Sequence, residues 1–417
     1  MLTGARKRGI SVAVVCPPES WHGEQRDTRL IETDNFSAPN LRKIVARLSH
    51  DFAIVGMCSS FGPFRPEGFV HQAVATVAAE LGLPHNTLDA LYRTSNKYLA
   101  REALAASRIP SVPFALATDE PSLLAASRSM GYPIVLKPIT GVGSSLILRC
   151  NDDRQAADKF RLAMQVLPQA HYEQVRMARH RFRTLDGALT EFDPVRSMLV
   201  EKYIEGREAS VECIAIGDRV EALVVHDKVV MEEAPTICFE HLLVAPPERF
   251  TADEVEAMRT YAVSVVQAIG LRNLFCHVEL RFTEDGPRLL EINPRLGAGC
   301  VRDSIETFTG MDVEAMEVAL VVGDCRLPEI VPRSTERHAM VFLFSPRSGV
   351  LVEMSGLRRV LRFPEVRAVR VGHQAGDRVG GDHEEVFLAS IWMEAPDTER
   401  AQALYQRIRE TVCIRVD

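Results

Sequence analysis

Short hydrophobic runs alternate with amphipathic stretches along the first 90 residues of the chain. Two runs are rich in β-branched or aromatic residues, and two longer stretches repeat their apolar positions with a helical period; in chain order these segments are residues 10–15, 41–48, 52–55 and 68–81. Buried strands separated by amphipathic helices are typical of a small α/β domain with a parallel sheet. We therefore expect residues 1–93 to form such a domain.

The pattern changes after residue 93. Thr94 and Ser95 are good N-cap residues, and they predict a helix from Lys97 to about residue 107. From residue 112 to about residue 230 the chain becomes rich in strands. We expect them at residues 134–137, 145–148, 198–204, 211–216 and 220–226, with a tight turn at Gly217 and Asp218 joining the last two. This part of the chain is predicted to be a mixed antiparallel module.

The hydrophobic period fades between residues 168 and 197, where four arginines crowd together at Arg176, Arg179, Arg181 and Arg183. Such a cluster can bind nucleic acid. No aromatic side chains interleave the charges, however, so we favour a solvated insertion over a nucleic-acid surface.

The last third of the chain begins with a long helical period at residues 254–269. A strand pair follows at residues 275–282 and 288–292, around a turn at Asp285 and Gly286. From about residue 336 the chain is again rich in strands and ends in a helix near residues 398–411 and a strand at residues 413–416. These changes divide the chain into four expected units, residues 1–93, 94–205, 206–335 and 336–417.

Composition narrows the class of protein. The 417 residues are 46% hydrophobic and 25% charged, which indicates a globular chain with a proper core, and the net charge of −7 gives no overall basic surface for nucleic acid or an anionic membrane. The partners expected are therefore small molecules. Nine cysteines without a C-x-x-C pair suggest reduced thiols in the cytoplasm, with neither zinc sites nor disulfides. The apolar run at residues 10–16 is too short for a signal peptide, and no run approaches 18 apolar residues, so no membrane span is expected.

The strongest cluster of candidate chemistry lies on the predicted strand pair near the end of the third unit. Alternate strand residues share a face, so Glu291 and Asn293 point the same way, and the hairpin near Asp285 brings Glu279 roughly opposite Glu291. Converging carboxylates need a cation, and an all-oxygen set suits Mg²⁺. Arg295 leaves the strand beside this set and could hold phosphate oxygens. An exposed hairpin face with scattered charges is the alternative.

A second candidate site is the strand that carries Lys137 and the glycine-rich loop after it. The loop contains Gly141, Gly143, Ser144 and Ser145, whose backbone N–H groups and hydroxyls could cover a phosphate. A plain hairpin turn is equally compatible with the loop alone. Its spacing fits neither a Walker A motif nor a dinucleotide fingerprint.

The third candidate is the segment from Glu201 to Glu208. Backbone groups near Lys202, Tyr203 and Ile204 could read an adenine edge, while Glu208 could accept from ribose hydroxyls. Without its neighbours this segment would be an ordinary charged hairpin. Lys97 on its own is weaker still, since a basic residue in the first turn of a helix is usually solvated.

Taken in order, these motifs resemble the ATP-grasp superfamily, and the resemblance covers essentially the whole chain. It implies an ATP-grasp fold of α/β and α+β units: an N-terminal α/β domain (1–93), a small lobe with a glycine-rich lid (94–205), a large lobe with the metal site (206–335) and a C-terminal α+β subdomain (336–417). It implies that Lys97 and Lys137 contact ATP phosphates and that the loop at residues 140–146 closes over them. The remaining roles implied are adenine binding by Glu201, Lys202, Tyr203 and Ile204, ribose binding by Glu208, Mg²⁺ binding by Glu279, Glu291 and Asn293, and stabilisation of the transferring phosphoryl group by Arg295.

Within the superfamily the chain is most similar to the L-amino-acid ligases, which make dipeptides such as bacilysin-type antibiotics. His277, Glu279 and the Glu291–Arg295 run match their pattern, as does the small C-terminal lobe. Residues 227–246 resemble their substrate loop, in which a glutamate and a histidine precede a proline; here these are Glu240 and His241. Relatives can carry a bulky aromatic residue after the arginine, whereas this chain has glycines at 297 and 299, which suggests a roomier second pocket.

The resemblance implies that ATP, with two Mg²⁺ ions that Mn²⁺ could replace, phosphorylates the carboxylate of one L-amino acid, and that the amine of a second attacks the acyl phosphate. Arg295 would be catalytic, and His277 or His241 could be the base for the amine, although a lone histidine is more often structural. Alternatives are a biotin carboxylase-like or other carboxylate ligase, and a nucleotide-binding regulatory protein. A homodimer is the expected assembly because two-fold dimers are the commonest.

Overall fold

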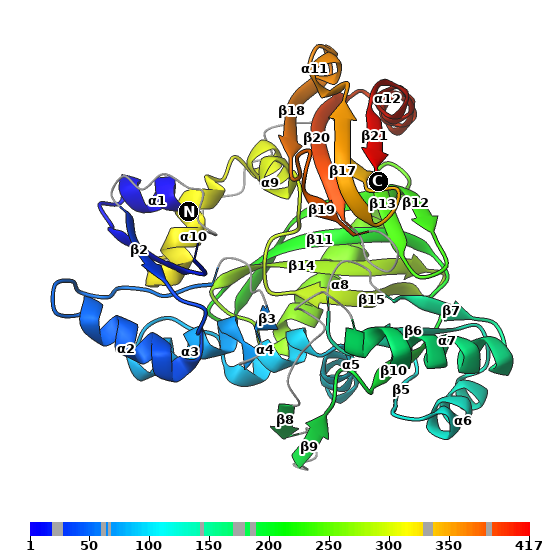
Figure 1. Cartoon of the computed structure of the whole chain (residues 1–417), viewed down its shortest axis with the longest axis horizontal. Coiled ribbons are helices and arrows are strands. Elements are labelled where there is room, and N and C mark those ends of the chain that lie inside the picture. Colours follow the sequence, from blue (N-terminus) through cyan, green and yellow to red (C-terminus); the bar gives the residue numbers. More distant parts are fainter. Residues whose placement is uncertain are drawn as a thin grey trace.

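The computed structural model of the chain describes residues 1–18, 28–59, 64–65, 68–141, 146–169, 180–183, 189–327, 337–380 and 386–417 (Figure 1). A large antiparallel sheet occupies its middle. A smaller sheet with two helices lies on one side of this large sheet and the N-terminal elements on another, while C-terminal strands extend the large sheet upward in the view of Figure 1. This mixture of helices and large antiparallel sheets agrees with the predicted α/β and α+β fold class.

The N-terminal elements include the expected parallel strands. β1 (Val12–Cys16) pairs in parallel with β2 (Thr28–Glu32). The amphipathic helices α2 (Ala38–Leu48) and α3 (Val70–Glu80) pack on each other through apolar residues that recur with the helical period. The prediction of a small parallel α/β unit is thus confirmed for these elements.

The run at residues 52–55 is not the strand that the sequence predicted. The structure assigns no strand there, and the side chains of Phe52 and Val55 are about half exposed, so the run lacks the burial that a central strand needs. A helix that the sequence did not predict, α1 (Leu2–Lys7), packs instead against α10 (Val313–Val322) far along the chain.

The smaller sheet has four antiparallel strands in the order β5 (Phe114–Ala117), β10 (Met198–Lys202), β6 (Ile134–Pro138) and β7 (Leu148–Cys150). Its apolar face packs against two helices that the sequence did not reveal, α6 (Glu120–Met130) and α7 (Asp153–Val166). Their buried stripes consist largely of small residues, alanine and serine, so the hydrophobic period was weak. Aspartates cap both helices at their N-termini.

The large sheet has eight antiparallel strands in the order β15, β14, β11, β12, β13, β16, β20 and β18. Their bounds are β11 (Arg207–Ile216), β12 (Arg219–Glu233), β13 (Cys238–Ala245), β14 (Leu274–Thr283), β15 (Gly286–Asn293), β16 (Arg337–Phe344), β18 (Val366–Val371) and β20 (Phe387–Ala395). β12 and β13 form a hairpin where the sequence suggested a substrate loop at residues 227–246. The expected boundary at residue 335 falls between β13 and β16, which are neighbours in this one sheet.

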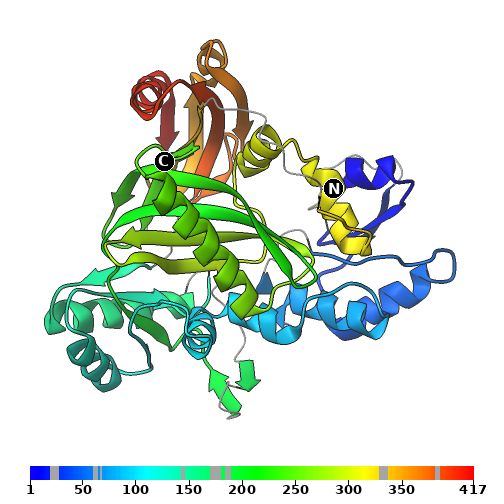
Figure 2. The same ribbon diagram turned by 180° about the vertical axis from the view of Figure 1, so that it is seen from behind.

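The long helix α8 (Ala252–Ile269) covers one face of strands β11 to β15 (Figure 2). It begins at a capping box of Thr251 and Glu254 and ends at Gly270, which adopts a left-handed conformation. Its apolar stripe packs on Val211, Val278 and their neighbours. Each fully buried side chain of this kind contributes about 1.5–3 kcal/mol relative to exposure. Since successive strand residues alternate, the same strands present their polar residues to the opposite face.

The C-terminal elements agree closely with the sequence. The predicted final helix and strand appear as α12 (Thr398–Thr411) and β21 (Cys413–Val416), with Asp397 capping the helix. The other elements of the described residues are short or lie at the edges: β3 (Phe64–Arg65), β4 (Gly68–Phe69), η1 (Leu167–Gln169), β8 (His180–Arg183), β9 (Leu189–Phe192), α9 (Val301–Thr309), β17 (Gly349–Ser355), α11 (Leu357–Val360) and β19 (Arg378–Val379). Among the described residues, every helix is too short or too polar to cross a bilayer.

The helix predicted from Lys97 is α5 (Lys97–Ala106), but its cap differs from the prediction. Asn96 caps it by accepting hydrogen bonds from the backbone N–H groups of Tyr98 and Leu99. Thr94 and Ser95 end the preceding helix α4 (Leu88–Ser95), which the sequence treated as a transition. The Asn96 cap places Lys97 at the first helical position, where its side chain faces the large sheet.

Candidate active site

A cavity of about 350 Å³ lies between the four-stranded sheet and the polar face of the large sheet. Strands β6, β7 and β10 form one side, and strands β11 to β15 form the other. Its lining includes three groups of predicted residues: the nucleotide-binding positions Lys97, Lys137, Glu201, Lys202, Tyr203, Ile204 and Glu208, the metal ligands Glu279 and Glu291, and Glu240 of the predicted substrate loop. Segments far apart in sequence therefore meet where the resemblance placed ATP.

Lys137 is fixed by a buried carboxylate. Its ammonium lies 2.9 Å from Glu201, whose other oxygen accepts a hydrogen bond from the buried Arg101. Burial alone would raise the pKa of Glu201, but Arg101 and Lys137 outweigh it and hold the pKa at about 2. Both oxygens are thereby engaged, so the structure gives Glu201 an anchoring position beside Lys137 where the sequence suggested an adenine contact.

Lys97 connects the helix α5 with the two sides of the cavity. Its ammonium lies 3.0 Å from Glu291 and donates a 2.9 Å hydrogen bond to the carbonyl of Gly141. Gly141 has a φ of 125°, a conformation that only glycine adopts readily, at the start of the predicted lid. Gly143, Ser144 and Ser145 of that lid lie outside the described residues. The two predicted phosphate lysines thus border the same cavity, each paired with a carboxylate.

The predicted adenine segment follows β10. Lys202 donates to the carbonyls of Gly131 and Tyr132, which ties the segment to the four-stranded sheet. The ring of Tyr203 lies 4.2 Å from the guanidinium of Arg149 and 5.2 Å from that of Arg281. These contacts stiffen the backbone on this side of the cavity.

Arg281 anchors the same segment to the large sheet. It donates to the carbonyl of Ile204 at 2.9 Å and to Glu208 at 2.9 Å. Burial would lower the pKa of Arg281, but Glu208 and Tyr203 raise it. The ribose and adenine candidates are therefore held together by an arginine that the sequence reading missed.

The strand pair β14–β15 brings the predicted metal ligands together. Glu279 pairs directly with Glu291, and Asn293, two residues further on the same face, pairs with His277. The amide of Asn293 donates to Glu279 at 3.5 Å. The predicted pairing of Glu279 with Glu291 is confirmed, and all three side chains carry oxygens of the hard type that Mg²⁺ prefers.

Lys228 lies fully buried at the centre of three carboxylates. Its ammonium is 3.0 Å from Glu208 and 2.9 Å from Glu279, and it also donates to Glu240. Burial would lower the pKa of Lys228, but the three carboxylates raise it well above the ordinary value. One ammonium does not offset all three charges: burial raises the pKa of Glu240 to about 7, while Glu208 and Glu279 have lowered values. Glu240 therefore borders the nucleotide cavity as a partner of Lys228.

His277 is not placed to act as a base. Its Nδ1 contacts the buried Glu212, and its Nε2 lies 3.4 Å from Glu279. Burial would lower the pKa of His277, but Glu212 and Glu279 raise it to about 10. The raised pKa favours the cationic imidazole, and both ring nitrogens already face carboxylates, so the geometry does not support the predicted role of His277 as a base.

His241 lines neither this nucleotide cavity nor the adjoining cavity lined by Arg295, contrary to its predicted place in a substrate loop. The pairing of β12 and β13 skips it at a bulge, with Glu240 opposite Met231 and Leu242 opposite Val230. Its ring packs near the C-terminal elements, against Phe344 and Tyr405, and its Nε2 contacts Glu232 at 3.0 Å. These aromatic contacts indicate that the imidazole of His241 has a structural role in packing.

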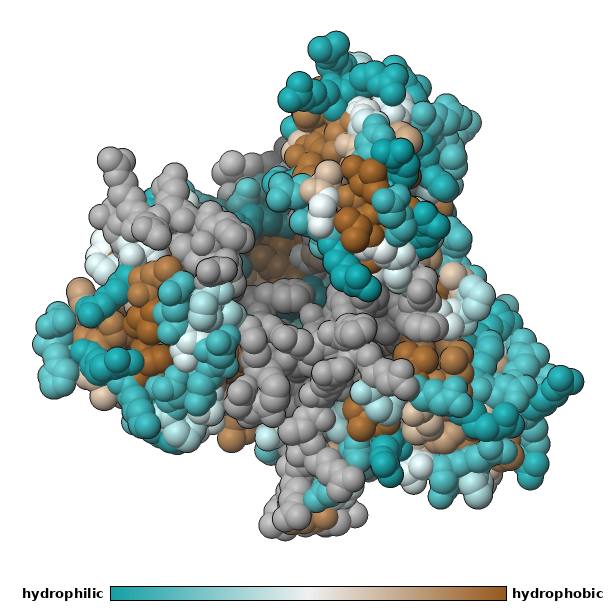
Figure 3. All heavy atoms as spheres, viewed as in Figure 1, coloured by the Kyte–Doolittle hydropathy of each residue, from teal (hydrophilic) through white to brown (hydrophobic). Residues whose placement is uncertain are grey.

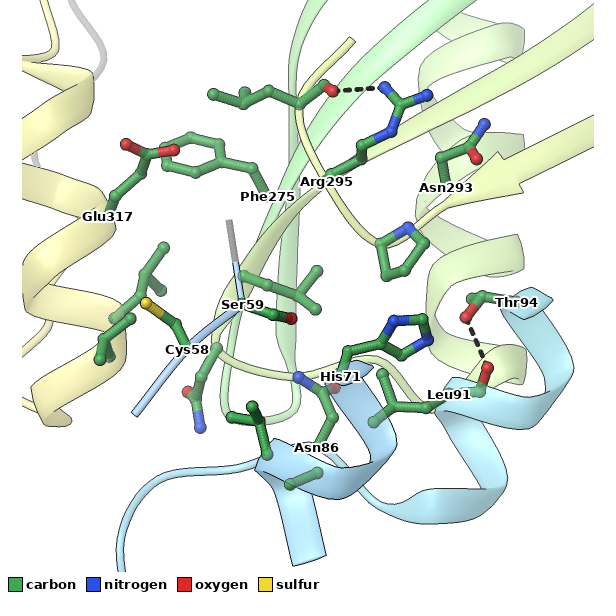
Figure 4. A pocket seen from close by; sticks show the side chains of 18 of the residues that line it. Cys58, Ser59, His71, Asn86, Leu91, Thr94, Phe275, Asn293, Arg295 and Glu317 are labelled. Carbon is green, nitrogen blue, oxygen red and sulfur yellow. Dashed lines mark hydrogen bonds between the residues drawn. The ribbon is translucent and has the colours of Figure 1, made fainter. Parts of the chain in front are cut away.

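A second cavity, of about 480 Å³, adjoins the first (Figure 4). Its walls come from α3, α4, α9, α10 and the segment that follows β15, and Glu291 lines it as well as the nucleotide cavity. Arg295 and Asn293 lie along one wall and Glu317 of α10 lies on the other (Figure 4). Burial lowers the pKa of Arg295. Apolar and polar side chains both line this cavity, in a hollow of the surface between the N-terminal elements and the C-terminal strands (Figure 3).

The glycines after Arg295 have a reason other than pocket size. A Cβ on Gly297 would lie 2.8 Å from Nδ1 of His277 and 3.0 Å from Glu212. Gly299 has a φ of 66°, and a Cβ there would press on the ring of Phe342. Both glycines thus bring the backbone close to neighbouring side chains, and the roomier second pocket stays a prediction.

Two family models match the chain. The ATP-grasp domain matches residues 130–303, and the L-amino acid ligase C-terminal domain 2 matches residues 341–417. The chain carries an ATP-grasp domain followed by an L-amino acid ligase C-terminal domain. The first match contains Lys137 and the whole β14–β15 site, and these families indicate an ATP-dependent ligase of the carboxylate–amine kind.

The chain is also similar to individual proteins and to solved structures. The chain is 23% identical to the uncharacterized protein y4rH of Sinorhizobium fredii over 92% of this chain and 73% of that protein, and 30% identical to carnosine synthase 1 of Gallus gallus over 46% of this chain and 20% of that protein. The L-amino acid ligase of Bacillus licheniformis superposes with a TM-score of 0.78 at 20% identity, covering 100% of this chain and 95% of that chain. The biotin carboxylase domain of Hydrogenobacter thermophilus 2-oxoglutarate carboxylase, solved with MgADP and bicarbonate, has a TM-score of 0.71 at 16% identity, covering 100% and 87%. At these identities the two structures establish the fold.

The site also contains four charged residues to which the sequence pattern assigned no role. The residues in question are Arg101, Glu212, Lys228 and Arg281, each engaged with a predicted site residue. A charged residue in the middle of an apolar strand or helix face was the available signal, because such positions are seldom charged without a partner.

Proposed function

We propose that this protein is an ATP-dependent ligase that phosphorylates the carboxylate of one L-amino acid and joins it to the amine of a second, giving a dipeptide, ADP and phosphate. The observation that carries the proposal is the position of Glu291, which lines both cavities. The phosphate end of a nucleotide in the first cavity would therefore meet a small substrate in the second. Arg295 borders that meeting point from the side of the second cavity.

Lys97 and Lys137 would bind the phosphates. Each is the cation of an ion pair, Lys97 with Glu291 and Lys137 with Glu201, so the ammonium groups are held at the cavity wall before nucleotide arrives. Phosphoryl transfer depends mainly on positioning and on neutralising charge, and preorganised cations supply both. Tyr203, Ile204 and Glu208 would hold the adenosine end, where Arg281 ties them together.

Glu279, Glu291 and Asn293 would hold Mg²⁺. Their donors are all oxygens, they lie on one face of β14–β15, and each carboxylate is already paired with a lysine ammonium, which marks both positions as suited to a cation. Mg²⁺ would neutralise phosphate charge when bound. Two ions, replaceable by Mn²⁺, are the number expected from the resemblance.

The reaction would proceed in two balanced steps. A carboxylate oxygen of the first amino acid attacks the γ-phosphorus, the bond to the β-phosphate oxygen breaks, and ADP leaves. The amine of the second amino acid then attacks the acyl carbon, the carbon–oxygen bond to phosphate breaks, and the departing phosphate takes up the proton that the amine loses. Arg295 would stabilise the negative charge of the transferring phosphoryl group and of the tetrahedral intermediate, because its guanidinium is buried at the wall of the second cavity.

Amino acids are the substrates best supported. The C-terminal domain match is to L-amino acid ligases, and the second cavity has room for small substrates with both polar and apolar parts. A biotin carboxylase-like reaction with bicarbonate is the alternative that the experiment below separates. A homodimer and a cytoplasmic location are further predictions from the sequence.

The test is phosphate release by the purified protein with ATP and Mg²⁺, across a matrix of L-amino acid pairs with bicarbonate and formate as controls. We expect release that needs both amino acids, with a dipeptide detected by mass spectrometry. Release with bicarbonate but with no amino acid pair would refute the proposal. Binding of nucleotide without turnover under every condition would favour a regulatory protein.

A further inference from the structure

We propose that Glu212 is a positioning residue of this ligase: through His277 and the backbone of Gly297 it fixes Glu279 and the turn that carries Arg295. This inference rests on the proposed function. Glu212 lies in β11, in the interior of the large sheet, with none of its surface exposed. It faces away from α8, on the polar face of the sheet. Glu208, four residues earlier in the same strand, lies on the same face.

The burial of this carboxylate is matched by specific partners. One oxygen contacts Nδ1 of His277, the residue directly opposite in β14, and the other accepts a 3.2 Å hydrogen bond from the N–H of Gly297. Burial would raise the pKa of Glu212, but His277, His226 and the Gly297 N–H lower it. A buried charge is retained where it is paired and hydrogen-bonded, and here both oxygens are used.

Each partner of Glu212 leads directly to a site residue. His277 reaches Glu279 through its second nitrogen, at 3.4 Å, and lies opposite Asn293 in the strand pair. Gly297 is two residues after Arg295, in the segment that walls the second cavity. The carboxylate of Glu212 thus restrains the predicted metal ligand Glu279 through one oxygen and the segment that carries Arg295 through the other. Groups that orient ligands in this way typically change activity by about 10- to 100-fold when removed.

The packing of Gly297 is independent support. Its backbone φ is outside the left-handed region, so conformational freedom does not explain the glycine. A Cβ would instead approach His277 and Val301 to 2.8 Å and Glu212 to 3.0 Å. The missing side chain lets the Arg295 segment close onto the Glu212–His277 pair. The contact between the Arg295 segment and Glu212 therefore depends both on the carboxylate of Glu212 and on the missing side chain of Gly297.

The experiment compares Glu212→Gln, which keeps the shape and removes the charge, with Gly297→Ala, which keeps the charge and pushes on the same contact. For both we expect kcat at saturating ATP and Mg²⁺ to fall about 10- to 100-fold. Because the two changes disturb one contact, we expect the double variant to lose little more than either single variant. A residue that only stabilised the fold would lower the amount of folded enzyme and leave the kcat of the folded fraction unchanged.

Two matched controls separate positioning from stability. His226 also lies beside Glu212, and its Nε2 is hydrogen-bonded to the hydroxyl of Ser304 at 2.8 Å. Ser304→Ala removes this hydrogen bond and leaves the contacts of Glu212 in place. Gly372→Ala adds a Cβ in ordinary contact, 3.4 Å from its nearest neighbour, at another glycine without a left-handed backbone. We expect both to keep kcat within two-fold, whatever their effect on the melting temperature.

A second measurement does not depend on turnover. ADP is titrated into each protein in a calorimeter, with and without Mg²⁺. Glu212→Gln should bind ADP alone with the wild-type affinity. The increase in ADP affinity that Mg²⁺ causes should be at least about ten-fold smaller than in the wild type. If the wild type binds ADP and Mg²⁺ but joins no amino acids, the proposed function fails and this titration still decides the role of Glu212. An unchanged gain from Mg²⁺, or a kcat within two-fold of wild type, would overturn the inference.

Discussion

The substitution Lys228→Met would test the charge balance of the nucleotide cavity most directly. Methionine keeps most of the volume of the side chain and removes its ammonium. Three carboxylates, from Glu208, Glu240 and Glu279, would then remain with oxygens within 4.8 Å of one another. Arg281 would still neutralise Glu208, and His277 would still contact Glu279.

The size of the effect follows from the burial. Removing one partner of a buried ion pair typically costs about 3–5 kcal/mol, because the charge left behind is neither solvated nor paired. Lys228 has no exposed surface on its side chain, and its contacts with Glu208 and Glu279 are 3.0 and 2.9 Å long. We therefore expect a loss of this order in the free energy of unfolding at pH 8, together with weaker binding of ADP.

The pH dependence gives the sign of the effect. Glu240 has its pKa raised to about 7, so its contribution to stability is complete below the ordinary value near 4.5 and is lost as the pH rises through about 7. Lys228 has a raised pKa, so it stays charged throughout this range. Without the ammonium, Glu240 would take up a proton more readily, and protonation relieves the repulsion. The difference between wild type and variant should therefore shrink as the pH falls from 8 to 5.5.

Differential scanning calorimetry of the nucleotide-free proteins at pH 8 and pH 5.5 measures this difference. Lys43→Met, at an exposed lysine of α2, is the control and should leave the transition unchanged at both pH values. Equal transitions for wild type and Lys228→Met at pH 8 would refute the reasoning. So would a loss of the same size at both pH values, because the carboxylates would then not be the cause.

Three further variants test other parts of the site. Arg101→Met should destabilise the protein by about 3–5 kcal/mol near neutral pH and weaken ADP binding, since Glu201 keeps only Lys137; unchanged melting and affinity would contradict this. Asn96→Ala should cost about 0.5–2 kcal/mol by uncapping α5 and raise the KM for ATP, whereas Asp397→Ala, an equivalent cap on α12, should lower stability without changing that KM. Arg295→Ala should lower amino-acid-dependent turnover by at least about 100-fold with ADP affinity within two-fold, and normal turnover would remove the proposed role.

Local pattern was enough to predict the frame of the site. Strand alternation and a two-residue turn placed Glu279 opposite Glu291 and Asn293 on the same face, because both depend on residues close in sequence. The final helix, Thr398–Thr411, was predicted with its observed bounds for the same reason. The helix α6 was missed because its two fully buried residues, Leu123 and Ser127, give its period little hydrophobic contrast.

The ionic contacts within the site could not be predicted in this way. Arg101 and Glu201 are 100 residues apart, and Glu212 and Gly297 are 85 apart, so only the folded sheet brings them together. The state of His277 illustrates the consequence. A histidine beside a carboxylate in sequence suggested a base, but a second carboxylate from another strand makes it a cation. Charge states depend on partners that sequence spacing does not reveal.

The ion pairs of Lys97 and Lys137 at the wall of the nucleotide cavity suggest how the protein limits the free-energy cost of binding a highly charged nucleotide. Lys97 is paired with Glu291, and the proposed complex needs the lysine on a phosphate and the glutamate on Mg²⁺. Each partner would then exchange one opposite charge for another, so neither would be left buried and unpaired before or after binding. Lys137 differs, because Arg101 remains on Glu201 and keeps that carboxylate neutralised when the lysine turns to a phosphate. The buried arginine is therefore what allows Lys137 to exchange partners without leaving Glu201 as an isolated charge.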